Sequence, residues 1–142
     1  MARKYLITGG TGFIGTALAR RLLSAGHELK IYDNNSRGRR ERLQGLAGEV
    51  QIVEGDIRDR ERLIGAAQGM DSLIHLAYIN GTEFFYNQPE MVLDIAIRGM
   101  LNVIDACRAE GIGELILASS SEVYQSPPQI PSSEAVPLSI PD

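Results

Sequence analysis

The chain has little cysteine and no long apolar run, which argues against a disulfide-stabilised protein and against a membrane-spanning one. Its 142 residues contain a single cysteine, Cys107, so no internal disulfide can form. Cys107 lies inside an apolar helical pattern that places no basic group beside it, and we expect a buried structural thiol rather than a nucleophile. No apolar stretch approaches the length of a membrane span, so no membrane partner is expected. The segment Met1 to Lys4 leaves no room for a cleavable signal before the first apolar run, and we expect a cytoplasmic protein.

Positive charge is also scarce. The chain carries 14 lysines and arginines against 18 aspartates and glutamates, so its net charge of −4 gives no general attraction for nucleic acid. The basic residues concentrate at Arg37, Arg39, Arg40 and Arg42, where a solvated loop is favoured over contact with a cofactor phosphate. No metal site is predicted. With 44% hydrophobic and 23% charged residues, the composition is typical of one globular domain.

Five short apolar runs alternate with helical patterns along the chain. They cover residues 5–7, 29–32, 50–53, 72–77 and 114–118. Each run is continuous rather than alternating in polarity, as strands covered on both faces are. This pattern predicts an α/β fold, a Rossmann-type doubly wound parallel sheet of at least five strands in the order 3-2-1-4-5. Ligands bind beyond the carboxyl ends of the strands in such a sheet.

A glycine-rich turn, Thr-Gly-Gly-Thr-Gly-Phe-Ile-Gly, follows the first run and leads into a helical pattern. Gly9 can adopt the backbone angles of a tight turn, Gly12 lets the main chain approach a pyrophosphate, and Gly15 lets the helix lie close to the strand. We expect the free N–H groups at the start of the helix, including those of Phe13 and Ile14, to face the phosphates. Strand, glycine turn and helix in this order predict a dinucleotide site.

An acid stands at the end of the second run, where a dinucleotide site requires one. Asp33 lies 33 − 12 = 21 residues after Gly12, the spacing at which a carboxylate binds the adenosine ribose. Asn34 opens the polar loop that follows, whose backbone we expect to wrap the adenosine. Asp33 would repel a 2′-phosphate, so we predict NAD as the cofactor. Arg37 keeps NADP open as a less favoured alternative.

Polar and small residues also follow the third and fourth runs. Asp59 is expected to cap the helix that begins near Arg60, which leaves Asp56 free for a second role. Two interpretations of Asp56 stay open: with Ile57 it forms an adenine site and accepts a hydrogen bond from the adenine amino group, or it is a plain loop acid. Ala77 is small enough to let a cofactor pack on bare backbone.

The segments between the fourth and fifth runs give weaker indications. His75 is expected to be a hydrogen-bonded core histidine rather than an acid or base. Residues 79–89 are predicted as a loop whose aromatic residues, Phe84 to Tyr86, either cover a substrate or fill a crevice. A helix is predicted over 89–109, with proline in its first turn. Because its apolar residues occupy more than one face, we predict that one face covers the sheet and that the other forms a homodimer interface over 90–109.

Three hydroxyls and a carboxylate follow the fifth run, in the stretch Ser119 to Tyr124. The fold places this stretch at the ligand edge of the sheet, although serines are also common in polar turns. No histidine is placed to activate a serine, so nucleophilic catalysis is not predicted. A hydrogen bond from a serine to a substrate hydroxyl needs no such base.

These motifs together resemble an extended short-chain dehydrogenase/reductase, and the resemblance covers essentially all 142 residues. Within that superfamily the chain is similar to the NAD-dependent epimerase/dehydratase family, which acts on nucleotide sugars. The motifs that carry the resemblance are residues 8–15, Asp33, 55–59, 75–77 and 119–124. By this resemblance the three glycines hold the cofactor, Asp33 binds the ribose and Asp56 binds the adenine. The resemblance further assigns Ser120, four residues before Tyr124, as the catalytic hydroxyl.

The same resemblance implies a reaction through a transient keto-sugar. A UDP-linked sugar would pass a hydride to NAD⁺ while Ser120 holds the reacting oxygen, and epimerisation, dehydration or decarboxylation would follow. Glu122 matches the second acid or base that the dehydratases and decarboxylases of the family carry, and that simple 4-epimerases usually lack.

The chain also departs from the family pattern. It contains no Tyr-x-x-x-Lys pair, because its only lysines are Lys4 and Lys30, and Ala96 and Gln125 replace a frequent asparagine and a usual glycine. We therefore expect residues 1–142 to be an incomplete NAD-binding Rossmann domain, truncated before the substrate domain, that does not turn over alone. A non-catalytic NAD-responsive module and a dimerisation fragment are the alternatives.

Overall fold

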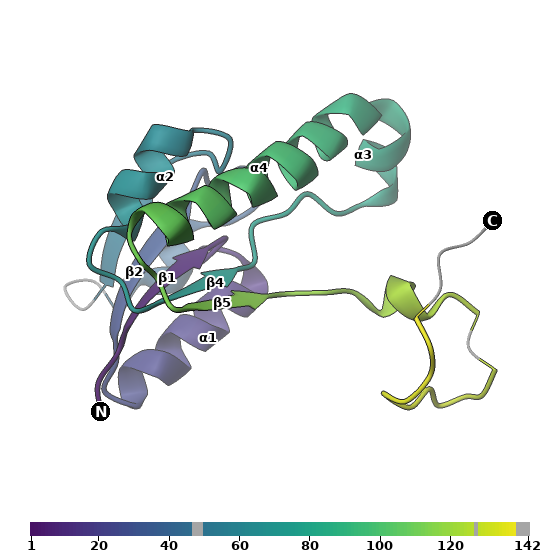
Figure 1. The fold of residues 1–142 in the computed structure, drawn as a ribbon, viewed down its shortest axis with the longest axis horizontal. Coiled ribbons are helices and arrows are strands. Elements are labelled where there is room, and N and C mark those ends of the chain that lie inside the picture. Colours follow the sequence, from purple (N-terminus) through teal and green to yellow (C-terminus); the bar gives the residue numbers. More distant parts are fainter. Residues whose placement is uncertain (47–49, 127, 139–142) are drawn as a thin grey trace.

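The computed structural model describes residues 1–46, 50–126 and 128–138, which form a five-stranded parallel sheet flanked by helices (Figure 1). The strands are β1 (Lys4–Thr8), β2 (Glu28–Asp33), β3 (Val50–Glu54), β4 (Ser72–His75) and β5 (Glu114–Leu117). They lie in the order β3-β2-β1-β4-β5 and every neighbouring pair is parallel, which confirms the predicted topology. The order reverses between β1 and β4, the point where a ligand crevice is expected in this fold.

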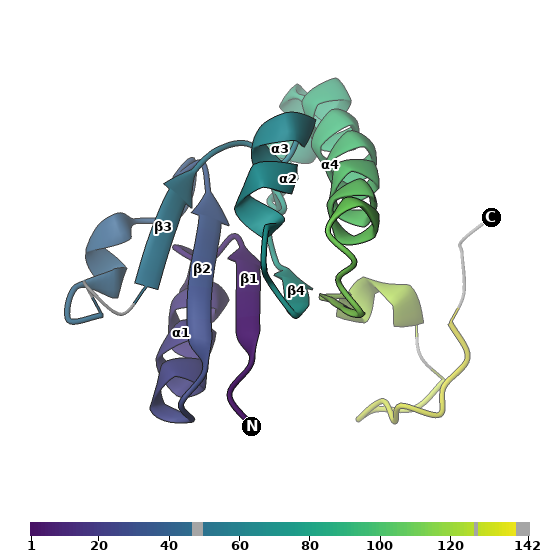
Figure 2. The ribbon, with the colours of Figure 1, turned by 60° about the vertical axis from the view of Figure 1, so that its left-hand side comes forward.

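Helices cover the two faces of the sheet (Figure 2). Helix α1 (Phe13–Ser24) packs on one face, and α2 (Arg60–Ala67) and α4 (Pro89–Ala109) pack on the other. The strands send alternate residues into the two layers, because successive side chains of a strand point to opposite faces. Leu6 of β1 therefore packs with the α2 and α4 layer, whereas Ile7 packs with the α1 layer.

The helix ends follow local turn chemistry. Gly26, two residues after α1, has a φ of +82°, a conformation that ends helices and that glycine adopts at little cost. Asp59 caps α2 by accepting a hydrogen bond from the Arg62 N–H at 3.1 Å, an interaction that stabilises a helix by about 1 kcal/mol. Pro89 is the first residue of α4, as predicted.

The segment before α4 differs from the prediction. Residues 79–89 were expected to form a loop, but Thr82–Asn87 form a short helix, α3, that begins after Gly81. Its aromatic residues occur in succession, which gives no apolar stripe at helical spacing, so the sequence pattern did not indicate a helix. None of the residues of α3 is buried.

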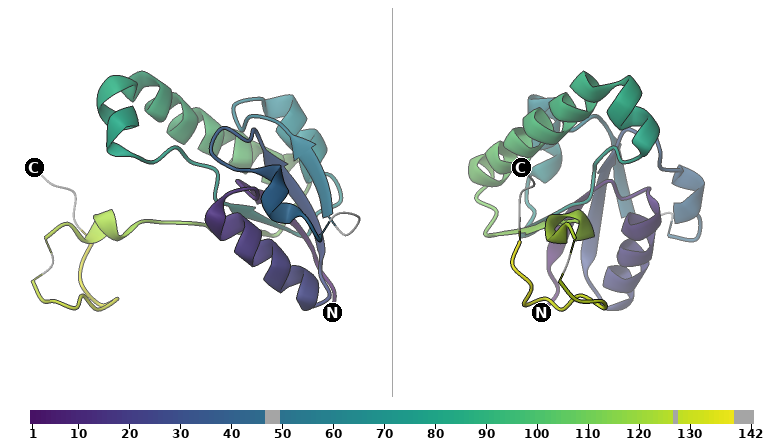
Figure 3. Two further views of the ribbon diagram at one scale, coloured as in Figure 1. Left: turned by 180° about the vertical axis from the view of Figure 1, so that it is seen from behind. Right: turned by 90° about the vertical axis from the view of Figure 1, so that its right-hand side faces the viewer.

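Strand β5 also departs from the prediction. The side chains of β4 are all buried, whereas Leu115, Ile116 and Leu117 of β5 are 36%, 45% and 55% exposed. The expectation of a strand covered on both faces is therefore wrong for β5 and for β3, none of whose residues is buried. Both strands lie at the edges of the sheet within the described residues. After Leu117 the chain leaves the sheet as an extended segment that contains the 3₁₀ helix η2 (Ser121–Tyr124) (Figure 3).

A second 3₁₀ helix, η1 (Arg40–Leu43), follows β2 and contributes Leu43 to the core on the α1 side. Across the described ranges of the chain, no helix is long and apolar enough to cross a membrane.

Candidate functional site

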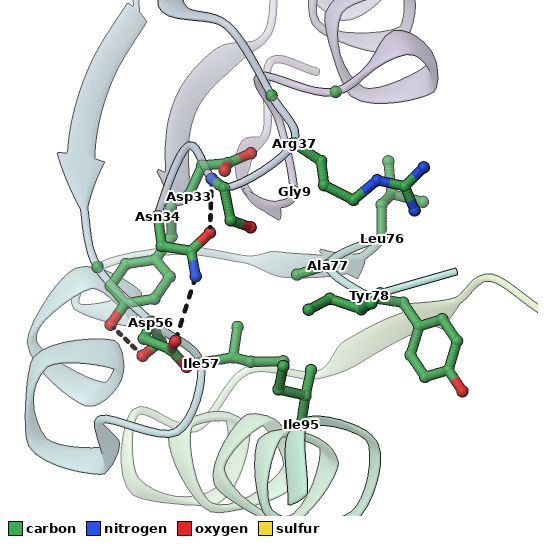
Figure 4. Close-up of a pocket in the computed structure, with 16 residues that line it drawn as sticks. Gly9, Asp33, Asn34, Arg37, Asp56, Ile57, Leu76, Ala77, Tyr78 and Ile95 are labelled. Atoms are coloured by element: carbon green, nitrogen blue, oxygen red, sulfur yellow. Dashed lines mark hydrogen bonds between the residues drawn. The ribbon is translucent and has the colours of Figure 1, made fainter. Parts of the chain in front are cut away.

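A pocket lies beyond the carboxyl ends of β1, β2, β3 and β4, where the strand order reverses (Figure 4). It encloses about 600 Å³, part of it open to solvent. Seven of the residues predicted to bind a cofactor line it, namely Gly9, Gly12, Asp33, Asn34, Asp56, Ile57 and Ala77. The fold thus brings together residues from four separate strand ends, and Ile95 of α4 closes one wall.

At two positions of the glycine turn, main-chain atoms leave no room for a side chain. Gly9 has a φ of +73°, and a β-carbon there would lie 2.7 Å from the Ala77 nitrogen. At Gly15 a β-carbon would lie 2.5 Å from the Gly9 carbonyl oxygen and 2.6 Å from the Gly10 Cα. The predicted tight turn at Gly9 and the predicted close approach of the helix at Gly15 are both confirmed.

The start of α1 is suited to an anion. Gly12 is its N-cap residue, no described side chain caps it, and its first turn contains no acidic residue. The first N–H groups of a helix have no partner within the helix, and they carry the positive end of its dipole. The side chains of Phe13 and Ile14 are 85% and 65% exposed and do not line the pocket, so these two residues can serve an anion only through their backbone N–H groups.

The Asp33 carboxylate at the end of β2 is buried and held by two backbone groups. Its Oδ2 accepts a hydrogen bond from the Thr11 N–H at 2.9 Å, and its Oδ1 accepts one from the Asn35 N–H at 2.8 Å. These bonds tie Asp33 to the glycine turn and orient the carboxylate. Because an ionised carboxylate offers about four acceptor positions, about two remain for the hydroxyl groups of a ligand.

Asp56, on the loop between β3 and α2, is bound on both oxygens by Arg58. The Arg58 Nη2 lies 2.8 Å from Oδ2 and the Arg58 Nε lies 3.0 Å from Oδ1. These hydrogen bonds lower the pKa of Asp56 to about 2, so the carboxylate is ionised at neutral pH. The Asn34 side-chain amide donates to Oδ2 at 3.1 Å from the opposite loop (Figure 4).

Two side chains that sequence reasoning did not select hold the main chain of this loop. The Tyr32 hydroxyl donates to the Asp56 carbonyl at 2.8 Å, and burial raises the pKa of Tyr32 to about 12. The Asn102 amide on α4 donates to the Ile57 carbonyl at 2.9 Å. Gly99, one turn earlier, permits this approach, since a β-carbon there would lie 2.3 Å from the Ile57 Cδ1. A buried asparagine on an apolar helix face was the one sequence feature that could have indicated the contact.

His75 and Cys107 are core residues, as predicted. The His75 Nδ1 lies 2.7 Å from the Thr8 Oγ1, and burial lowers the pKa of His75 to about 4, so the imidazole is neutral at pH 7. The Thr8 Oγ1 also accepts hydrogen bonds from the N–H groups of Leu76 and Ala77, each at 3.3 Å, which fixes the chain where it enters the pocket. Cys107 is buried, and burial raises the pKa of its thiol.

Arg37 lines the pocket and is engaged with the segment after β4. Its guanidinium donates to the Asn80 carbonyl and lies 5.9 Å from the centre of the Phe84 ring. Phe84 of the aromatic cluster thus packs against a pocket residue. No group of three or more histidine, cysteine, aspartate or glutamate side chains that could hold a metal ion occurs among the described residues.

Ser120 and Glu122 lie outside the pocket. Ser120 is the N-cap residue of η2, its Oγ accepts a hydrogen bond from the Glu122 N–H at 3.2 Å, and both side chains are exposed. Neither residue lines the pocket. The structure therefore brings seven of the ten cofactor-binding candidates together in the pocket but neither of the two catalytic candidates, and the roles of all of them remain predictions.

The sheet order, the glycine turn at a bare helix start and the oriented acid after β2 define a Rossmann-type nucleotide-binding fold. A family model described as "NAD dependent epimerase/dehydratase family" matches residues 5–141, and the chain belongs to this family.

Comparison with known proteins identifies close sequence relatives. The chain is 36% identical over 141 residues to a UDP-glucose 4-epimerase of Neisseria meningitidis serogroup B, an alignment that covers 95% of this chain and 42% of the relative. It is 35% identical over 140 residues to a UDP-glucose 4-epimerase of Klebsiella pneumoniae, covering 93% of this chain and 99% of that sequence. The chain thus spans about two fifths of the length of the first of these curated relatives.

Among solved structures, the chain is similar to a UDP-glucose-4-epimerase from Stenotrophomonas maltophila with bound NAD and formylated UDP-arabinopyranose. The TM-score is 0.89 at 25% sequence identity, and the match covers 96% of this chain and 43% of that one.

Proposed function

We propose that this chain binds NAD in the pocket beyond β1 to β4. The observation that carries the proposal is the joining of Gly9 and Gly12, the uncapped start of α1 and the oriented Asp33 carboxylate in one pocket. Membership of an NAD-dependent family and the NAD bound by the Stenotrophomonas relative support it.

The residues present fit the adenosine and pyrophosphate parts of the dinucleotide. The pyrophosphate would lie at the start of α1, beside Gly12 and the N–H groups of Phe13 and Ile14. Asp33 has about two acceptor positions left, which suit the two hydroxyls of the ribose. Its negative charge disfavours a 2′-phosphate, so NAD is preferred to NADP. The Asp56 and Ile57 loop would hold the adenine, and Ala77 would let the cofactor approach the main chain of β4.

We further propose that residues 1–142 form the NAD-binding Rossmann domain of a nucleotide-sugar epimerase, dehydratase or decarboxylase. The family and the names of the relatives support this, and a UDP-sugar is the proposed substrate. When bound, the nicotinamide supplies a reversible hydride acceptor for oxidation of a sugar carbinol. Ser120 would hold the sugar oxygen by a hydrogen bond, and Glu122 would exchange a proton with the substrate. For these roles, the sugar would have to contact η2, the 3₁₀ helix that carries Ser120 at its start and Glu122 within it.

We expect turnover to need groups that these 142 residues lack. The sequence contains no tyrosine four residues before a lysine, so it lacks the proton-transfer pair that the family resemblance requires. Purified chain alone should therefore bind cofactor without interconverting UDP-glucose and UDP-galactose. Measurable turnover by this chain, with no other polypeptide present, would contradict the proposal.

The outer face of α4 is the proposed homodimer interface. Leu93, Ile97 and Leu101 recur every fourth residue and are 58%, 59% and 58% exposed. An apolar stripe of this kind on a helix surface is typical of a helix–helix contact. Sedimentation velocity should show a dimer that Ile97→Glu dissociates, whereas Ala109→Glu, at the far end of the same helix, should leave it intact. A monomeric wild-type chain at all concentrations would reject this interface.

We also propose that the protein works in the cytoplasm, where nucleotide sugars and NAD are both present.

Isothermal titration calorimetry with NAD⁺ tests the main proposal. Gly12→Val should weaken binding about tenfold or more, because the new side chain would occupy the pocket. A β-carbon at Gly12 would lie 3.1 Å from the Gly9 carbonyl oxygen, so circular dichroism should first show that the variant folds. Gly113→Val is the matched control, because a β-carbon at Gly113 meets no atom within 4 Å. Absence of NAD⁺ binding by the folded wild-type chain, or equal binding by both variants, would overturn the proposal.

A further inference from the structure

We propose that Arg58 and Asp94 are positioning residues that aim the Asp56 carboxylate at the amino group of the adenine. The proposal deepens the proposed function and depends on NAD binding in this pocket. An ion pair between the β3–α2 loop and helix α4 would thus contribute to recognition of a purine amino group.

The first step is the way Arg58 holds Asp56. Its Nη2 donates to Oδ2 at 2.8 Å and its Nε donates to Oδ1 at 3.0 Å, so the guanidinium grips both oxygens. The Arg58 backbone N–H adds a third hydrogen bond, to Oδ1 at 2.9 Å. A planar fork on a planar carboxylate fixes the plane of the carboxylate as well as its position, which a lysine ammonium cannot do.

The second step is the anchoring of Arg58 itself. An arginine side chain that is 36% exposed has considerable rotamer freedom unless a partner holds it. Asp94 on α4 supplies that partner, with its Oδ2 3.2 Å from the Arg58 Nη1. Asp94 is held in turn by Arg98, one helical turn along, whose Nε lies 2.6 Å from its Oδ1. The orientation of Asp56 is therefore set by helix α4 as well as by its own loop.

The third step counts the acceptor positions that remain on Asp56. Of about four on an ionised carboxylate, Arg58 occupies three, and the fourth is taken by the Asn34 amide at 3.1 Å. The Asn34 bond is the longest of the four and comes from a different loop across the pocket (Figure 4). It occupies the position that an adenine amino group, also an N–H donor, would take on binding. Hydrogen bonding to Arg58 also keeps the pKa of Asp56 low, so the carboxylate acts as an acceptor only.

The test compares NAD⁺ with nicotinamide hypoxanthine dinucleotide, which carries a carbonyl oxygen in place of the amino group. Calorimetry on the wild-type chain should show NAD⁺ binding about tenfold more tightly or better, because a carbonyl cannot donate to Asp56. Arg58→Gln should bring this ratio close to one, Asp94→Asn should reduce it about threefold, and Arg58→Lys should fall between wild type and Arg58→Gln.

The controls are a neighbouring ion pair of the same kind. Arg60 at the start of α2 pairs with Asp105 of α4 at 2.8 Å, and neither residue lines the pocket. Arg60→Gln and Asp105→Asn should therefore keep the wild-type ratio. If Arg58→Gln does not fold, Asp94→Asn decides the matter, because it leaves Arg58 and Asp56 paired.

Three results overturn the inference. A wild-type ratio near one would show that Asp56 does not accept the amino group. An unchanged ratio in the Arg58 and Asp94 variants, with both dinucleotides weakened equally, would show a structural role only. Loss of the ratio in the Arg60 and Asp105 controls would show a general effect of the contact between α2 and α4. Absence of any NAD⁺ binding by wild type would instead reject the proposed function itself.

Discussion

Gly15→Ala should destabilise the chain, although alanine is normally the better helix residue. Gly15 lies in α1, where alanine would be favoured by about 1 kcal/mol if the space allowed it. A β-carbon there would meet three backbone atoms, the Gly9 oxygen at 2.5 Å, the Gly10 Cα at 2.6 Å and the Gly10 carbonyl carbon at 2.9 Å, and none can move without shifting the glycine turn. Overpacking costs about 1–3 kcal/mol, with backbone contacts at the upper end. The net loss should be about 2 kcal/mol, a large share of a typical stability of about 5–15 kcal/mol.

Gly65→Ala provides the matched control. Gly65 lies inside helix α2, and a β-carbon there meets no atom within 4 Å, so the same substitution should stabilise the chain by about 0.5–1 kcal/mol. Urea unfolding followed by far-ultraviolet circular dichroism measures both free energies of unfolding. The two variants should move the midpoint in opposite directions. If Gly15→Ala proved as stable as wild type while Gly65→Ala behaved as expected, the close approach of α1 to the turn would be refuted.

Three further predictions follow from single contacts. Asp33→Ser should weaken NAD⁺ binding about tenfold and raise the affinity for NADP⁺ relative to NAD⁺, because the repelling charge is gone; calorimetry with both dinucleotides checks this, and an unchanged preference would contradict it. Tyr32→Phe should lower the free energy of unfolding by about 1 kcal/mol through loss of the hydrogen bond to the Asp56 carbonyl, and urea unfolding showing no change would reject that contribution. His75 has a pKa of about 4 in the folded chain against about 6.5 when unfolded, so the unfolded chain binds more protons between these values and stability falls as pH drops from about 6.5 to about 4, by about 3 kcal/mol in all. Urea unfolding at several pH values should show that His75→Gln removes this part of the pH dependence; a wild-type slope in that variant would contradict the assignment.

Much of the fold could be predicted because its signals are local. Continuous apolar runs mark buried parallel strands, and the turn chemistry of Gly26, Asp59 and Pro89 marks helix ends, so the strand order and most helix bounds follow from pattern alone. Helix α3 was missed because consecutive aromatic residues leave no helical stripe. The exposure of β5 was missed because burial at a sheet edge depends on neighbours rather than on the residues of the strand.

The site divides in a similar way. The glycine turn and Asp33 could be placed at the pocket because main-chain geometry and spacing constrain them directly, whereas spacing left two interpretations of Asp56 open. Tyr32 and Asn102 were missed, because their hydrogen bonds reach carbonyl groups 24 and 45 residues away along the chain. Ser120 could be selected from its sequence motif, but in the described residues it lies on η2, outside the pocket.

We expect the exposed strand β5 to favour self-association of this chain. In the described part of the chain one of its edges is left without a partner strand, and its leucine and isoleucine side chains face solvent. An exposed strand edge can pair with a strand edge of another copy. Head-to-tail contacts between copies form open filaments rather than closed dimers. The turbidity of concentrated solutions should therefore rise on warming. A mild detergent that binds the apolar side chains of β5 should prevent this rise. Since no residue of β5 lines the pocket, such a detergent would leave cofactor titrations undisturbed.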